Sequence, residues 1–246
     1  MPLITIIGRG HSGTRTISHT LYGSGVFMGK TLNASGDKVP PQAMYRACRI
    51  LARSVTWLGG LEWDFSALHE REIAPEFEHL VREYLADILS VENEPRGWKL
   101  PETTLAYPWI VRIFPDARYV YLVRDPRDCI INGHLTDDLS DFGIEYPETD
   151  DVRQRRAISW KYQYDIVAST PRPRHFLTVR FEDFVLQQER TLRQLEDFLG
   201  IPLARIVVRP ESVGRWKTDT STHLYDFFRG PMIENGYTDG LDGGSA

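Results

Sequence analysis

A glycine-rich turn near the start of the sequence gathers residues suited to holding an anion. It follows an apolar, β-branched run, residues 3–7, and precedes a segment that can be helical. The turn consists of Arg9, Gly10, His11, Ser12, Gly13, Thr14 and Arg15. Glycines let a backbone turn sharply and approach a ligand closely, and free N–H groups at a helix N-terminus attract negative charge. The hydroxyls of the turn can cap the helix, and its arginines and histidine add positive charge.

The turn therefore predicts a phosphate cradle, although a plain strand-to-helix turn with glycines for geometry is the simpler alternative. It is not an ordinary ATP- or GTP-binding loop. That motif, GxxxxGK[ST], needs a lysine for the terminal phosphates and a hydroxyl for magnesium. Gly8 and Gly13 have the spacing, but Thr14 stands at the lysine position and Arg15 at the hydroxyl position. The loop can hold a phosphate, but it lacks the parts for a metal-bridged triphosphate.

A second charged segment follows a predicted buried strand, residues 119–123. Arg124 ends that strand, so it should lie at the carboxyl edge of the sheet beside the first loop. A helix over 127–135 would place Asn132 about two turns along, where it can face the same ligand. The alternative is that Arg124 and Asp128 simply pair with each other at a strand-to-helix corner.

A third segment lies near the end of the sequence. Its cationic and glycine residues are Arg209, Gly214, Arg215 and Lys217, and Trp216 lies among them. A solvated basic loop is the usual outcome for such a run, so the segment means little by itself.

The remaining sequence alternates helical and strand patterns. Helices are expected over 13–23, 41–57, 74–91, 104–114, 127–135, 152–168 and 188–199, and strands over 3–7, 25–29, 98–100, 119–123 and 176–181. This alternation predicts an α/β fold with a largely parallel sheet and a ligand at the carboxyl ends of its strands. We expect a single domain over residues 1–246, with a frayed, glycine-rich tail over 240–246.

Composition excludes several classes of protein. A net charge of −5 over 246 residues gives no basic field for nucleic acid. No run approaches the ~18 apolar residues of a membrane span, and no His/Cys/Asp cluster has metal-ligand spacing. Two cysteines, Cys48 and Cys129, suggest a reducing compartment rather than a disulfide framework. We therefore expect a cytoplasmic protein without a bound metal, with a homodimer left open.

In order and spacing, the three charged segments resemble the sulfotransferases that use 3′-phosphoadenosine 5′-phosphosulfate (PAPS). The first loop is most similar to the heparan 3-O-sulfotransferase branch, and residues 124–128 are similar to the family's RxPxD motif. Residues 180–184 and 198–201 are similar to its YED and FLG motifs. The resemblance covers about residues 3–232. It implies a three-layer, P-loop-like domain whose central, mostly parallel sheet has about five strands.

The resemblance also implies roles for the charged segments. The first loop would hold the 5′-phosphosulfate, Arg124 and Asn132 the 3′-phosphate, and the late loop would close over the nucleotide. Lys99, in a Lys-x-Pro strand end, would assist the transfer. His11 stands where the family has lysine or arginine, and it would touch the bridging or sulfuryl oxygens.

The acceptor needs a general base. Carbohydrate branches of the family use a glutamate just after the second strand, and Asp37 is the nearest acid here. Glu102, just past Lys99, is the rival. Asp37 could instead cap a helix near residue 40, and Glu62 and Asp64 are more distant candidates.

These features predict an enzyme that moves a sulfuryl group from PAPS to a hydroxyl or amine acceptor and releases PAP. The acceptor would be a small molecule, a carbohydrate or a lipid-linked group, bound along residues 30–75 beside Lys30, Tyr45, Trp57 and Trp63. Two alternatives stay open: a P-loop-type kinase, and a PAP- or PAPS-binding module without catalysis, which His11 suggests.

Overall fold

Four parallel strands form the central sheet in the order β4-β1-β5-β6. The computed structural model describes residues 1–241. The strands are β1 (Leu3–Ile7), β4 (Arg96–Lys99), β5 (Arg118–Val123) and β6 (Phe176–Arg180). Because all pairings are parallel, the residues that follow these strands meet at one edge of the sheet.

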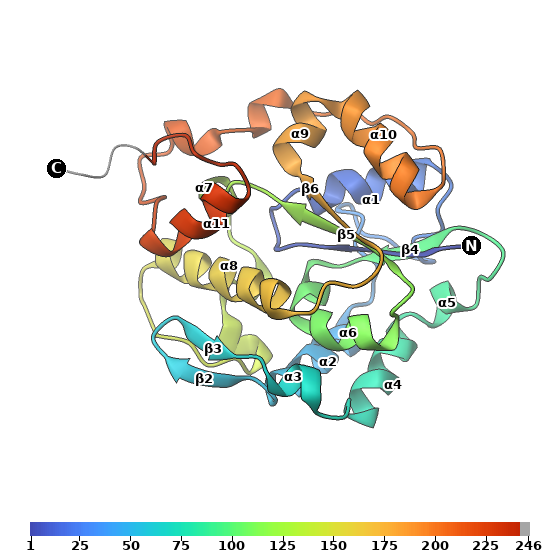
Figure 1. The fold of residues 1–246 in the computed structure, drawn as a ribbon, viewed down its shortest axis with the longest axis horizontal. Coiled ribbons are helices and arrows are strands. Elements are labelled where there is room, and N and C mark those ends of the chain that lie inside the picture. The colour runs from blue at the N-terminus through green and yellow to red at the C-terminus, as the bar shows by residue number, and fades with distance from the viewer. Residues whose placement is uncertain (242–246) are drawn as a thin grey trace.

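Helices cover both faces of the sheet, which gives three layers (Figure 1). On one face lie α1 (Thr14–Gly23), α9 (Phe181–Leu186) and α10 (Gln188–Leu199). On the other lie α2 (Gln42–Ala52), α6 (Tyr107–Ile113) and α8 (Val152–Ser169). The remaining helices are α3 (Ala67–Glu70), α4 (Pro75–Tyr84), α5 (Ala86–Leu89), α7 (Pro126–Cys129) and α11 (Arg229–Glu234).

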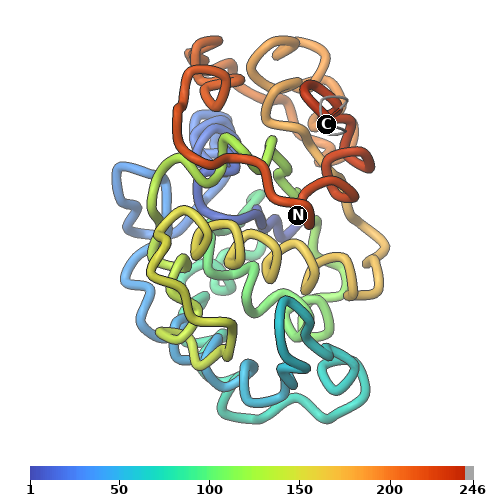
Figure 2. The backbone as a smooth tube through the Cα atoms, turned by 90° about the vertical axis from the view of Figure 1, so that its left-hand side faces the viewer, coloured from blue at the N-terminus to red at the C-terminus, as the bar shows by residue number. Residues whose placement is uncertain are grey.

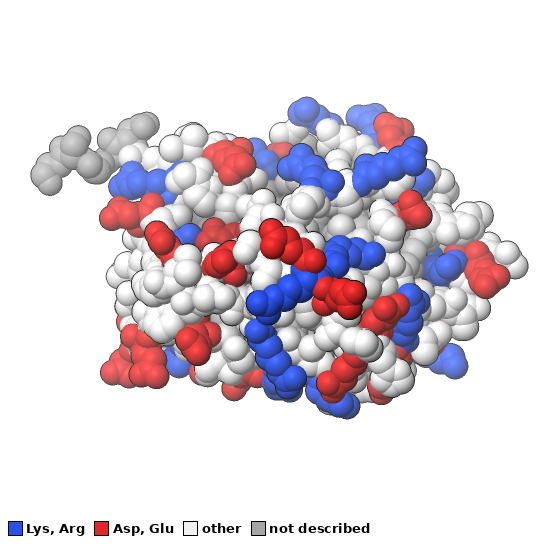
Figure 3. Space-filling view, turned by 60° about the horizontal axis from the view of Figure 1, so that its bottom comes forward, with Lys and Arg blue, Asp and Glu red and all other residues white. Residues whose placement is uncertain are grey.

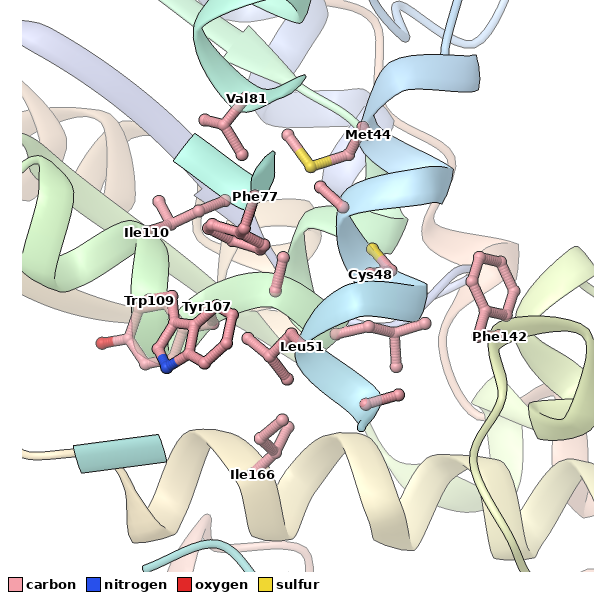
Figure 4. Close-up of a cluster of buried hydrophobic side chains, with 14 of the residues drawn as sticks. Met44, Cys48, Leu51, Phe77, Val81, Tyr107, Trp109, Ile110, Phe142 and Ile166 are labelled. Atoms are coloured by element: carbon pink, nitrogen blue, oxygen red, sulfur yellow. The ribbon is translucent and has the colours of Figure 1, made fainter. Parts of the chain in front are cut away.

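Each face of the sheet has its own hydrophobic core. Ile4 and Ile6 of β1 pack with α1 and α10, whereas Ile7 and Tyr119 join the larger cluster beneath the sheet. Figure 4 shows this larger cluster, in which Met44 and Leu51 of α2 meet aromatic side chains of α4 and α6. Both cores are formed by apolar residues that recur with the helical period in the helices and with the strand period in the strands.

The expected strand over 25–29 forms only one bridge to the sheet. Phe27 N–H donates to the Pro95 carbonyl at 2.9 Å, and Gly97 N–H donates to the Phe27 carbonyl at 2.9 Å. Gly25 and Gly29 flank it with φ of 81° and 109°, where extended pairing cannot continue. The sheet therefore has four strands rather than about five.

The expected helix over 127–135 is wrong. Helix α7 ends at Cys129, and Asn132 lies exposed in a bend instead of two turns along a helix. Arg156 of α8 donates to the Ile131 carbonyl at 2.7 Å and the Ile130 carbonyl at 3.3 Å. Because this guanidinium takes the carbonyl groups, the chain can leave the helix without unpaired acceptors.

Other boundaries differ more mildly. The helix expected over 41–57 ends at Ala52, and β2 (Thr56–Gly59) and β3 (Glu62–Asp64) form an antiparallel hairpin. The helix expected over 74–91 breaks into α4 and α5. The expected tail covers 240–246. Its residue Leu241 donates its N–H to the Thr238 carbonyl at 3.1 Å, and residues 242–246 lie outside the described residues.

The surface carries both signs of charge. On the face in Figure 3, basic and acidic side chains lie interspersed, in keeping with the small net charge. Among the helices described in residues 1–241, none is long and apolar enough to cross a membrane.

Candidate functional site

The first loop forms an open ring of backbone N–H groups between β1 and α1. His11 has φ of 68° and Gly13 has φ of 96°, so successive peptide groups turn their N–H vectors the same way. Within residues 1–241, the N–H groups of His11, Gly13 and Thr14 donate to no protein acceptor. Such a nest at a helix N-terminus is an anion site.

Two glycines let other side chains press against this loop. A Cβ on Gly10 would lie 2.1 Å from the His134 ring, and one on Gly13 would lie 2.1 Å from the Phe181 ring. Neither position tolerates a side chain without a shift of an aromatic ring. The expected caps are absent: Gly13 is the N-cap of α1, and neither Ser12 nor Thr14 caps the helix with its side chain.

His11 is neutral near pH 7 in this arrangement. Burial lowers its pKa below 6.5, nearby Arg9 adds to that effect, and a hydrogen bond to the Gly133 carbonyl opposes it. The Nε2 atom lies 2.8 Å from that carbonyl oxygen. His11 therefore lies at the loop but carries a charge only if a bound anion raises its pKa.

Arg9 turns away from the nest. Its guanidinium donates to the carbonyl of Cys129 at 2.8 Å and that of Gly10 at 3.0 Å, and it pairs with Asp137. The residue is 4% exposed. These contacts tie the first loop to the segment after α7, so Arg9 positions the loop. Arg15, by contrast, is exposed and donates to Ser35 Oγ at 2.7 Å.

Arg124 joins all three charged segments, and its contact with the first loop is the one that its place at the end of β5 predicts. It donates to the His11 carbonyl at 3.0 Å, to Asp128 Oδ2 at 3.0 Å and to the Ser212 carbonyl. Its guanidinium also lies 4.4 Å from the centroid of the Phe181 ring. The pairing with Asp128 that the sequence allowed is present, together with contacts to the other two loops.

The late loop docks on Asp128. Gly214 N–H and Trp216 N–H each donate to this carboxylate at 2.9 Å. In Figure 2 the late loop passes over the side of the molecule on which α1 lies. Arg209, Arg215 and Lys217 remain exposed on this loop, and Lys217 lies 3.1 Å from Asp239.

Lys99 and Asp37 form an ion pair at the end of β4. The ammonium contacts Asp37 and donates to the Ser35 carbonyl at 2.9 Å. Burial lowers the pKa of Lys99, and Asp37 opposes that effect. Asp37 also accepts from Asn33 at 2.8 Å and does not cap α2, whose N-cap is Pro41. Asp37 thus holds the lysine in place.

Glu102 lies in a 3₁₀ helix, residues 101–106, directly after β4 and is 2% exposed. Burial raises its pKa from 4.5 to about 7, with Asp37 adding to the rise and Lys99 opposing it. Within the described residues its Oε2 atom has no hydrogen-bond partner. A buried carboxylate that titrates near neutral pH is suited to accept a proton.

No pattern in the sequence pointed to His134 as a residue of the site. Its Nδ1 accepts from Thr136 N–H at 3.2 Å, so the neutral ring carries its proton on Nε2, 4.0 Å from Glu102 Oε1. Burial, with Arg9 next in effect, lowers its pKa to about 3. His134 therefore stays neutral between the first loop and Glu102.

Other predicted residues lie on the β2–β3 hairpin and on α2. Trp63 is buried, Trp57 lies on the β2–β3 hairpin, and Glu62 and Asp64 belong to the same hairpin. Tyr45 is half-buried on α2 and its ring packs edge-on against Phe142 at 5.8 Å. Among residues 1–241, no three His, Cys, Asp or Glu side chains gather as a metal site.

The chain is similar to known sulfotransferases in sequence. The profile described as "Sulfotransferase family" matches residues 2–205. The chain is 26% identical over 220 residues to "Protein-tyrosine sulfotransferase 1" of Danio rerio, a match that covers 87% of this chain and 57% of that protein. The chain thus spans little more than half the length of this curated relative.

The fold is similar to two solved sulfotransferase domains. The "Sulfotransferase Domain from the Curacin Biosynthetic Pathway" has a TM-score of 0.59 and 14% identity, with 96% of this chain and 98% of that chain covered. The "Sulfotransferase Domain from the Synechococcus PCC 7002 Olefin Synthase" has a TM-score of 0.53 and 16% identity, with 96% and 94% covered. At these identities the likeness establishes the α/β fold.

Proposed function

Because the chain belongs to the sulfotransferase family, we propose that it transfers a sulfuryl group from PAPS to a hydroxyl or amine acceptor and releases PAP. The observation that carries this proposal is the nest of free N–H groups in the first loop, at the same sheet edge as Lys99 and Glu102. The cytoplasmic location stays a prediction from the sequence, and a homodimer stays open.

The residues at the carboxyl edge of the sheet are suited to bind the phosphates of PAPS. N–H groups of His11, Gly13 and Thr14 would hold the 5′-phosphosulfate. Arg124 would hold the 3′-phosphate through charge-assisted hydrogen bonds. Its Nε makes no hydrogen bond within the described residues, whereas its Nη2 already meets Asp128 and the Ser212 carbonyl. Asn132 lies exposed in a bend nearby in sequence, and its contact with the phosphate stays a prediction.

When bound, PAPS supplies the sulfuryl group and a phosphate leaving group that gains negative charge. Lys99 would stabilise that charge, since Asp37 and the Ser35 carbonyl hold its ammonium at the end of β4. His11 can add a second cation once an anion beside it favours the protonated ring. No step needs these residues to bind a metal.

We assign the general base to Glu102 rather than Asp37. Asp37 is engaged by Lys99 and Asn33, whereas one Glu102 oxygen is free of protein partners and the carboxyl titrates near neutral pH. His134 Nε2–H faces the other Glu102 oxygen and would help to orient it. The acceptor would approach Glu102 beside Tyr45. Because one relative is a protein-tyrosine sulfotransferase, phenols are among the hydroxyl acceptors to test.

Ligand-dependent thermal stability tests the nucleotide preference. PAP without magnesium should raise the melting temperature, because a ligand that binds only the folded state stabilises it. A P-loop kinase would instead be stabilised by ATP with magnesium. Stabilisation by Mg-ATP and not by PAP contradicts the proposal.

A further inference from the structure

A separate cavity of about 250 Å³ opens between the α8-covered face of the sheet and α11. None of the residues that line it belongs to the candidate site described above. Its size is just below the range of drug-sized ligand pockets, about 300–1,000 Å³, so it suits a molecule with a single ring.

The floor of this cavity is aromatic. Phe176 of β6 lies between two tyrosines, with ring centroids 5.9 Å from Tyr121 and 6.3 Å from Tyr107. The interplanar angles are 40° and 48°, so the three rings form a tilted wall. Such a surface favours contact with another ring.

Two phenol hydroxyls at this floor have no protein partner. Within residues 1–241, neither Tyr107 nor Tyr121 makes a side-chain hydrogen bond, although Tyr107 is only 1% exposed. Burial raises the pKa of both phenols, so both keep their protons and act as donors. Neither hydroxyl oxygen is among the fully buried unpaired atoms of the described residues, and both tyrosines line the cavity, so an acceptor atom of a ligand can reach them.

The mouth of the cavity carries one positive charge. The Arg172 guanidinium is exposed, lies 5.1 Å from the centroid of the Phe176 ring and pairs with no carboxylate of the described residues. Glu234, the acid on the opposite wall, already accepts a hydrogen bond from Tyr164. That hydrogen bond comes from a neutral phenol and does not remove the carboxylate charge. The lining therefore carries one cation, Arg172, and one anion, Glu234, and a ligand carboxylate would pair with Arg172 at the mouth.

We propose that this cavity binds a small aromatic carboxylate. Its ring packs against Phe176, its carboxylate pairs with Arg172 at the mouth, and a hydrogen-bond acceptor on the far side of the ring meets Tyr107 and Tyr121. This site is independent of the nucleotide edge and of the proposed sulfuryl transfer.

The probe for this site is 4-acetylbenzoate, which has the carboxylate and the distal carbonyl but no hydroxyl or amine to be sulfated. Its binding to the full chain is measured by ligand-observed NMR or calorimetry, beside 4-acetylbenzamide, which lacks the charge. Arg172→Gln should weaken the carboxylate roughly tenfold by removing a charge-assisted contact. Tyr107→Phe, which keeps the ring, should weaken it severalfold.

Arg174→Gln is the matched control, because Arg174 is also exposed but does not line the cavity. It should leave the affinity unchanged, and saturating PAP should not displace the probe. The proposal is overturned if 4-acetylbenzoate does not bind, if the amide binds equally well, or if both arginine variants lose the same affinity. Displacement by PAP would place the probe at the nucleotide edge and would also overturn it.

Discussion

Glu102→Gln should make the protein more stable and less active at the same time. The carboxyl is 2% exposed, and burial raises its pKa from 4.5 to about 7. Ionising such a group in the folded state is unfavourable, so the charge lowers stability at the pH where a general base must work. Glutamine keeps nearly the same shape without the charge.

The size and pH window of the effect follow from the pKa. Because the folded pKa lies above the unfolded value, the stabilising contribution is fully present below pH 4.5 and is lost as pH rises through about 7. At 1.36 kcal/mol for each pH unit, the loss reaches about 3 kcal/mol at pH 8. For a chain of this length that corresponds to roughly 6–12 °C in melting temperature.

The assay is thermal unfolding of both proteins from pH 4 to pH 8, with turnover measured at pH 8. The variant should match the wild type at pH 4, exceed its melting temperature at pH 8 and lose roughly 10²–10⁴ in kcat. Glu83→Gln, at an exposed glutamate, is the control and should show no pH-dependent difference. An equal melting-temperature difference at pH 4 and pH 8, or full turnover, would refute the assignment of Glu102.

Three further predictions concern the charged groups around it. Asp37→Asn should destabilise the fold by about 3 kcal/mol, because it leaves the buried Lys99 ammonium without its carboxylate; urea unfolding that shows no change would remove the ion pair from the account. Arg124→Ala should weaken PAP by about 1.5–3 kcal/mol and adenosine 5′-phosphosulfate far less; equal losses in calorimetry would mean that Arg124 only supports the fold. If the His11 imidazolium assists the leaving group, activity should fall as pH rises through its pKa, which burial lowers below 6.5 before a bound anion raises it again. His11→Lys should move this alkaline limb upward, and an unchanged pH–rate profile would show that His11 does not act as a cation.

Residues at strand ends were the most predictable part of the site. Arg124 follows the apolar strand β5 and Lys99 is the last residue of β4, and a parallel sheet brings such ends to one edge. The same alternation predicts the parallel sheet and its flanking helices, but not the loss of the strand expected over 25–29, which leaves four strands. The local sequence pattern, together with parallel pairing of the strands, is enough to predict the strand-end residues and the flanking helices.

Contacts between distant segments were not predictable. The helix after β5 stops early because Arg156, on a different helix, takes its carbonyl groups. His134 presses on Gly10 from another loop, so no spacing in the sequence links them. Asp37 could be expected near a helix start, but its pairing with Lys99 depends on the path of the chain between them. Tertiary contacts decided each of these cases.

Transfer of label from ³⁵S-PAPS tests the central proposal most directly. The protein is incubated with labelled PAPS and with extract fractions separated into phenols, carbohydrates, lipids and peptides, beside a Lys99→Ala variant. The account predicts stoichiometric release of PAP and label on one acceptor fraction, with both lost in the variant. PAP binding without label transfer to any fraction would contradict it and would indicate a nucleotide-binding module without catalysis.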